Sequence, residues 1–213
     1  MFQAGTLTMK MTNHWNRVIY RLWAPIYDVT VNRFFMPGRK RALEVLALRP
    51  GERVLIVGVG TGADLSFLPA GVEAVGIDYS PDMLNQARHK LPFLHSPVQL
   101  VRGDAQQQLV RDRSFDAAIL NLILSVIPDG QICLEVTLRA LKPGGRAVIF
   151  DKFLNDNGKP SAGRRFVNRF STFLGTDITR QFGNIAKGCD ILVTHTEPSL
   201  LHGTYRVILI RKP

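Results

Sequence analysis

The chain is short of acidic residues: its 213 residues hold 17 Asp and Glu against 27 Lys and Arg, a formal net charge of +10. It also has only two cysteines, Cys133 and Cys189, whose spacing fits neither a metal site nor a disulfide framework. The longest apolar run, 117–127, is interrupted by Asn121 and Ser125 and is too short to span a bilayer. Because residues 1–10 lack the apolar core of a signal peptide, we expect the protein in the cytoplasm.

The basic excess lies in two segments. Residues 1–41 carry seven basic residues and one acid, and residues 159–187 carry six basic residues and one acid. The rest of the chain is close to neutral, with 14 basic and 15 acidic residues. Such asymmetry predicts a polyanionic partner, either nucleic acid or an anionic membrane.

The body of the chain alternates between strand and helix patterns. Apolar runs typical of buried strands occur at 54–58, 72–78, 97–103, 115–122, 146–151 and 205–210, and helical patterns occur near 62–69, 81–91 and 131–141. This alternation predicts an α/β fold in which helices cover both faces of a parallel sheet. Ligands of such sheets bind beyond the carboxyl ends of the strands.

The first predicted strand ends in a glycine-rich turn, V-G-V-G-T-G, that contains Gly58, Gly60 and Gly62. Such a turn lets the backbone approach a ligand closely. With Asp78 at the next strand end to accept hydrogen bonds from ribose hydroxyls, the turn fits either a dinucleotide or an S-adenosylmethionine site. Asp104 ends the third strand, where it can accept from an exocyclic amine. No Tyr-x-x-x-Lys pair for hydride transfer is present, which favours the second interpretation.

Residues 51–152 resemble the class I S-adenosylmethionine-dependent methyltransferases, because VLIVGVGTG, VGIDYSPDML, RGDA and LKPGG follow one another in that family's order. The resemblance implies a Rossmann-like, seven-stranded, mostly parallel sheet, S-adenosylmethionine as methyl donor, S-adenosylhomocysteine as product, and no metal. It assigns Gly58, Gly60 and Gly62 to the methionine part of the donor, Asp78 to the ribose, Tyr79 and Met83 to the adenine face, Asp104 and Ala105 to the adenine edge, and Asn121 to the methyl-donating end.

One position departs from the family pattern. The family usually has Glu or Asp two residues before the first glycine, and this chain has Ile56. A carboxylate that helps to compensate the donor's ammonium is therefore missing. We expect Ile56 to be a buried strand residue, with backbone carbonyls in place of the carboxylate or a weaker affinity for the donor.

Residues 14–23 predict an amphipathic helix that contains both tryptophans of the chain. A basic helix with Trp on its apolar face suits a membrane interface, although an ordinary helix docked on its own core has the same pattern. The residues expected at the membrane are Trp15, Arg17, Ile19, Arg21, Leu22 and Trp23. Residues 164–174 show the same pattern, an apolar stripe of phenylalanines with arginines beside it. These stripes favour an anionic membrane over nucleic acid, whose binders spread basic residues along a groove.

Residues 21–41 carry a narrower resemblance. Their W-A-P-x-Y-D element and the P-G-R that follows are similar to the N-terminal lid of bacterial phospholipid N-methyltransferases, which methylate phosphatidylethanolamine. The resemblance implies stepwise N-methylation of this lipid toward phosphatidylcholine, at the inner face of the cytoplasmic membrane. Two alternatives stay open: C-methylation of a ubiquinone or menaquinone precursor, and an RNA-binding module with a methyltransferase-like fold.

We therefore expect a basic lid at residues 1–41 and a methyltransferase domain at 42–213 that includes a basic insertion at 159–187. Tyr20 and Tyr27 are candidates for positioning the amine, because aromatic rings attract an ammonium in every methylation state. Arg33, Arg165 and Arg180 are candidates for the lipid phosphate.

Overall fold

The computed structural model describes residues 32–154 and 179–213. Within these ranges lie the helices α2 (Asn32–Leu46), α3 (Pro81–Lys90), α4 (Gly130–Ala140), α6 (Phe182–Ile185) and α7 (Leu200–Gly203), and the short 3-10 helices η2 (Leu65–Phe67) and η3 (Leu91–Phe93). The strands are β1 (Arg53–Val57), β2 (Glu73–Asp78), β3 (Val98–Arg102), β4 (Phe115–Asn121), β5 (Leu141–Lys152), β6 (Leu192–Pro198) and β7 (Tyr205–Arg211).

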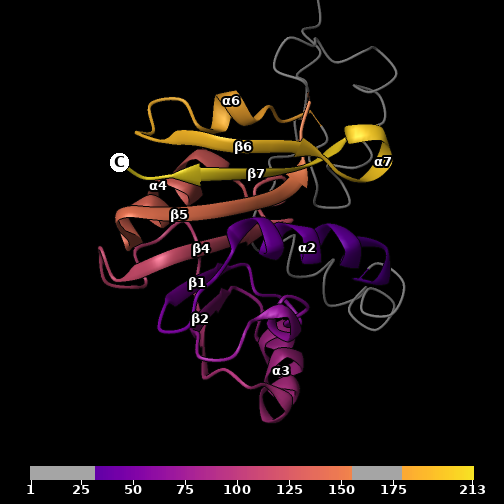
Figure 1. Cartoon of the computed structure of the whole chain (residues 1–213), viewed down its shortest axis with the longest axis vertical. Coiled ribbons are helices and arrows are strands. Elements are labelled where there is room, and N and C mark those ends of the chain that lie inside the picture. Colours follow the sequence, from indigo (N-terminus) through magenta and orange to yellow (C-terminus); the bar gives the residue numbers. More distant parts are fainter. Residues whose placement is uncertain (1–31, 155–178) are drawn as a thin grey trace, which may run out of the picture.

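The strands form one sheet in the order β3-β2-β1-β4-β5-β7-β6 (Figure 1). The first five of these are mutually parallel, and β7 runs antiparallel to both of its neighbours. The predicted seven-stranded, mostly parallel sheet is confirmed.

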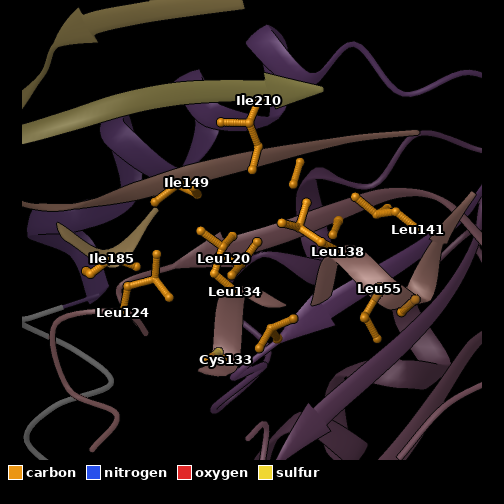
Figure 2. Packing of buried hydrophobic residues seen from close by; sticks show 14 of the residues in the cluster. Leu55, Leu120, Leu124, Cys133, Leu134, Leu138, Leu141, Ile149, Ile185 and Ile210 are labelled. Atoms are coloured by element: carbon orange, nitrogen blue, oxygen red, sulfur yellow. The ribbon is translucent and has the colours of Figure 1, made fainter. Parts of the chain in front are cut away.

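Alternate side chains of the central strands enter two separate cores. In β4, Ala118 and Leu120 face one core, whereas Ala117 and Ile119 face the other. Leu134 and Leu138 of α4 pack in the first core, whose interdigitated side chains are shown in Figure 2. Helices α2 and α3 cover the second core. Helices on both faces explain why the strands read as continuous apolar runs.

Helix α2 lies against the sheet at Gly38. A Cβ atom built there would lie 2.2 Å from Cζ of Phe150, so only glycine allows the helix to approach β5 this closely. The same helix buries Ala42 and Leu46 completely. The expected boundary at residue 41 therefore falls inside a helix that belongs to the sheet domain.

Two local predictions need correction. The helix expected near 62–69 is a turn followed by the 3-10 helix η2, because Gly62 has a φ of +77° and Leu68 is extended. β6 was not among the predicted strands. It is an edge strand with Leu192 and Val193 exposed, and it lacks the apolar pattern of a buried strand.

The expected lid helix at 14–23 and the segment at 164–174 lie outside the described residues. Among the helices that the structure describes, none has the length and apolar character needed to cross a membrane.

Candidate functional site

A cavity opens at the carboxyl ends of β1, β2, β3 and β4, where the sheet topology predicts a ligand. Residues that line it come from the loop after β1, from the end of β2 and the start of α3, from the loop after β3, and from the loop after β4. They include eight of the nine residues predicted to bind the donor: Gly58, Gly60, Asp78, Tyr79, Met83, Asp104, Ala105 and Asn121.

The glycine turn after β1 forms one wall of the cavity. Gly58 has a φ of +70°, and a Cβ atom on it would lie 2.8 Å from Cδ1 of Ile123 across the cavity wall. Gly60 has a φ of +55°. Gly62 is the ninth predicted residue, and it does not line the cavity: its missing side chain makes room for Leu65 and Ala87. Its role in this structure is packing.

Asp78 ties the glycine turn to the next loop. Its Oδ2 accepts a hydrogen bond from the Gly60 amide at 2.8 Å, and its Oδ1 accepts one from the Ser80 amide at 2.9 Å. Burial raises the pKa of the Asp78 carboxyl above its usual value, and the amide hydrogen bonds oppose that shift. Each carboxylate oxygen has a second lone pair, so the group can still accept from two hydroxyls.

The adenine candidates line the next part of the cavity. Tyr79 is exposed and Met83 is buried, and α3 starts between them with the Ser80 hydroxyl accepting from the Met83 amide. Asp104 accepts hydrogen bonds from the backbone and side-chain amides of Gln106, at 3.0 and 3.1 Å. Gln106 therefore holds the carboxylate in place at the cavity wall.

The loop after β4 is strained and apolar. Leu122 has a φ of +59°, unusual for a residue with a side chain, and its amide donates to the Phe150 carbonyl at 2.7 Å. Such strain is concentrated at functional sites. Leu122 lines the cavity together with Ile123, Val126 and Ile127, so the cavity wall next to Asn121 is apolar.

A buried polar triad lies at the cavity, and two of its three residues, Arg39 and Asp64, were not predicted from the sequence. Nη1 of Arg39 lies 2.8 Å from Oδ2 of Asp64, and Oδ1 of Asp64 accepts from the Asn121 amide at 2.9 Å. All three side chains are buried, and Arg39 and Asn121 line the cavity. From the sequence, Arg39 falls within the basic lid expected at residues 1–41. The local sequence signal for a buried Arg39 is the glycine before it, since Gly38 lets this part of α2 approach the sheet closely.

Ile56 is buried among core side chains, as expected. Arg33 is exposed near the start of α2. Arg180 donates to the carbonyl oxygens of Leu124 and Pro128, at 2.6 and 3.0 Å, which fixes the loop after β4. A phosphate role for Arg33 and Arg180 stays a prediction. Tyr20, Tyr27, Arg165 and the six membrane candidates lie outside the described residues.

Comparison with known sequences identifies methyltransferases as relatives of this chain. A family model described as a methyltransferase domain matches residues 55–149. Phosphatidylethanolamine N-methyltransferase of Cereibacter sphaeroides is 34% identical over 158 residues, which cover 73% of this chain and 77% of that protein. Demethylmenaquinone methyltransferase of Renibacterium salmoninarum is 32% identical over 131 residues. That match covers 59% of this chain and 54% of the relative, so the chain spans about half of its length.

Solved structures share the fold. An S-adenosylmethionine-dependent methyltransferase of Thermotoga maritima superimposes with a TM-score of 0.69 over 93% of this chain and 100% of its own. Its sequence identity is 19%, so the likeness concerns the architecture alone.

Proposed function

Since the chain belongs to the class I S-adenosylmethionine-dependent methyltransferases, we propose that the acceptor of its methyl group is the amine of phosphatidylethanolamine. The single observation that carries this proposal is the match to the Cereibacter sphaeroides enzyme, which covers 73% of the chain, against 59% for the quinone-precursor enzyme of Renibacterium salmoninarum. Repeated transfer to the same nitrogen would lead to phosphatidylcholine.

The residues at the cavity fit the methyl donor, whose sulfonium supplies an electrophilic methyl group. In this proposal Gly58 and Gly60 admit the methionine part against bare backbone, and Asp78 accepts from the ribose hydroxyls. Asp104, held by Gln106, accepts from the adenine amine. Support comes from the position of these residues around one cavity and from the space that a Cβ atom on Gly58 would fill.

The acceptor amine must lose its proton before attack, because its lone pair forms the new bond. A primary ammonium has a pKa of about 10.4 in water, and removal from water lowers this pKa. The apolar wall of Leu122, Ile123, Val126 and Ile127 supports such desolvation beside Asn121. Positioning and water exclusion then supply most of the catalysis. We assign Tyr20 and Tyr27 to holding the amine in each methylation state.

We place the reaction at the cytoplasmic face of a membrane. One stripe of α2 supports this assignment: Arg33, Met36, Pro37 and Lys40 recur at helical spacing and are all exposed. Phe34 beside this stripe is 47% exposed. Basic and apolar side chains together suit an anionic lipid surface. The N-terminal segment with Trp15 and Trp23 would extend that surface.

The test of the acceptor is incubation with methyl-labelled donor and vesicles that contain phosphatidylethanolamine, phosphatidylglycerol and a demethylated quinone, followed by separation of the lipids. Label in mono-, di- and trimethylated phosphatidylethanolamine supports the proposal. Label confined to the quinone would replace it with C-methylation. Absence of label from every lipid would refute a lipid acceptor.

The membrane assignment has a separate test in co-sedimentation with anionic vesicles. Arg17→Glu with Arg21→Glu reverses two charges of the expected lid, and binding at low salt should fall. Arg139→Glu with Arg211→Glu makes the same change at two exposed residues near the amino ends of the parallel strands and should leave binding nearly unchanged. Equal co-sedimentation of wild type and the lid variant would contradict a membrane role for that segment.

A further inference from the structure

The buried triad of Arg39, Asp64 and Asn121 leaves two polar atoms without a partner. Among the described residues, Nε of Arg39 has no hydrogen-bond acceptor and Oδ1 of Asn121 has no donor. Arg39 is 8% exposed and Asn121 3%, so bulk water has little access to either side chain. Buried polar atoms without partners are uncommon and costly, and each one calls for an explanation.

The two unpaired atoms are opposite in character and share one carboxylate. Asp64 is 1% exposed and contacts Arg39 through Oδ2 and Asn121 through Oδ1. Its negative charge offsets the guanidinium, so the triad carries no net charge while it presents one unused donor and one unused acceptor. That pattern is complementary to a zwitterion, in which a carboxylate accepts and an ammonium donates.

We infer that Arg39 and Asn121 bind the α-amino acid end of the methyl donor: Arg39 takes its carboxylate, Asn121 takes its ammonium, and Asp64 holds both side chains in place. Arg39 and Asn121 line the same cavity as Gly58 and Gly60, where the methionine part of the donor would lie. A guanidinium suits the carboxylate because it stays charged and donates from a rigid fork.

The arrangement also accounts for the missing acid at position 56. Ile56 is 1% exposed and lies among the core side chains under α2, so it offers the donor no charge. Asp64 supplies a carboxylate within the triad instead. Arg39 can reach the cavity because Gly38 lets α2 sit on the Phe150 ring.

The test uses calorimetric titration with three compounds: S-adenosylmethionine, its decarboxylated form, and 5′-methylthioadenosine, which lacks the amino acid end. It measures the donor and not the acceptor, so its outcome is independent of the lipid proposal. Wild type should bind S-adenosylmethionine about 10- to 100-fold more tightly than the decarboxylated form, as expected for a charge-assisted hydrogen bond in a site of low polarity. Equal affinity for the two would overturn the inference without any mutation.

The variants assign the preference to Arg39. Arg39→Gln should bind the two sulfonium compounds equally, with the affinity for 5′-methylthioadenosine unchanged. Because this change leaves Asp64 buried without its cation, the double variant Arg39→Gln with Asp64→Asn removes both charges and provides a second route to the same measurement. Arg41→Gln is the matched control, since Arg41 is exposed and paired with Glu197. A retained preference in both Arg39 variants, or an equal loss for all three compounds, would show that Arg39 has only a structural role.

Discussion

Two arginines, Arg146 and Arg39, have contrasting environments. Arg146 lies at the amino edge of the sheet, where the parallel strands begin, and Arg39 lies at the carboxyl edge, where they end. At the amino edge, both Nη atoms of Arg146 lie 2.8 Å from the Glu52 carboxylate, and Nε and Nη2 also donate to the Leu46 and Ala47 carbonyls. Every nitrogen of that guanidinium is used. At the carboxyl edge, Arg39 pairs with Asp64, and its Nε has no acceptor among the described residues. Arg39 is a residue of α2, and Arg146 contacts the C-terminal end of that helix.

The two edges of the sheet differ in how many of their polar groups are paired within the chain, and this difference suggests that one edge serves stability and the other binding. The amino edge is closed by contacts within the chain, including Lys142 with Asp116 and Lys212 with two backbone carbonyls. The carboxyl edge has the cavity and, among the described residues, two buried polar atoms without partners, Nε of Arg39 and Oδ1 of Asn121. We therefore expect substitutions at the amino edge to change the free energy of unfolding, and substitutions at the carboxyl edge to change donor affinity.

The largest expected effect is at Asp78. Asp78→Ala removes the acceptor of the Gly60 amide and the acceptor that we propose for the donor ribose, so donor affinity should fall about 100-fold or more. Calorimetry with S-adenosylhomocysteine measures it. Asp116→Ala is the matched control at the amino edge, because Asp116 also accepts from a backbone amide, that of Arg53 at 2.9 Å. Unchanged affinity in folded Asp78→Ala would remove this residue from the site.

Arg146→Gln should have the next largest effect, and on stability alone. The change breaks the ion pair with Glu52 and frees the last carbonyls of α2, at a cost of about 2–3 kcal/mol in the free energy of unfolding. Denaturant unfolding measures this loss, and donor affinity of the folded variant should equal that of wild type. A large loss of affinity would mean that the two edges are coupled through α2.

Gly58→Ala should weaken donor binding more than Gly144→Ala does. The two glycines have nearly the same φ, +70° and +71°, so the backbone cost of about 1–2 kcal/mol is shared. Only at Gly58 does the new methyl group meet a neighbour, Ile123, whereas nothing lies within 4 Å at Gly144. Comparable affinity in the two variants would contradict a tight cavity wall at Gly58.

The smallest effect concerns acid stability. The hydrogen bonds from Arg146 hold the pKa of Glu52 below its ordinary value of 4.5. A lowered pKa stabilises the folded state above the unfolded-state value, and this contribution is lost as the pH falls through the folded-state value. Unfolding free energies measured between pH 6 and about pH 3 should therefore fall less steeply in Glu52→Gln than in wild type. Parallel profiles would exclude Glu52 as a source of acid sensitivity.

Much of the carboxyl edge could be predicted from the sequence because its signals are local. The glycine turn, Asp78 and Asp104 each follow directly on an apolar run, and the sheet topology then brings the strand ends together. Gly62 shows the limit of this reasoning, since the same motif supplies both cavity and packing glycines. Gly62 packs against Ala87 of α3, and this contact between separate elements decides that Gly62 is a packing glycine and not a cavity glycine.

Arg39 could not be separated from its neighbours by sequence alone. It stands in the run Arg39-Lys40-Arg41, in which the structure buries the first residue and exposes the other two. That choice depends on the contact between Gly38 and Phe150, residues far apart in the chain. Its partner Asp64 lies in the turn before η2, where the sequence pattern predicts a helix. Arg39 lines the cavity because of packing between residues far apart in the sequence, and a local sequence pattern does not predict such packing.

The most direct test of the central claim, that the carboxyl edge holds the methyl donor, is a titration with S-adenosylhomocysteine followed by backbone amide NMR. Gly58, Gly60 and Ala105 line the cavity, so their amide resonances should shift strongly, whereas the amide resonances of Gly51 and Gly144 at the amino edge should not shift. Shifts centred on Gly51 and Gly144, or no shifts at saturating ligand, would contradict the account.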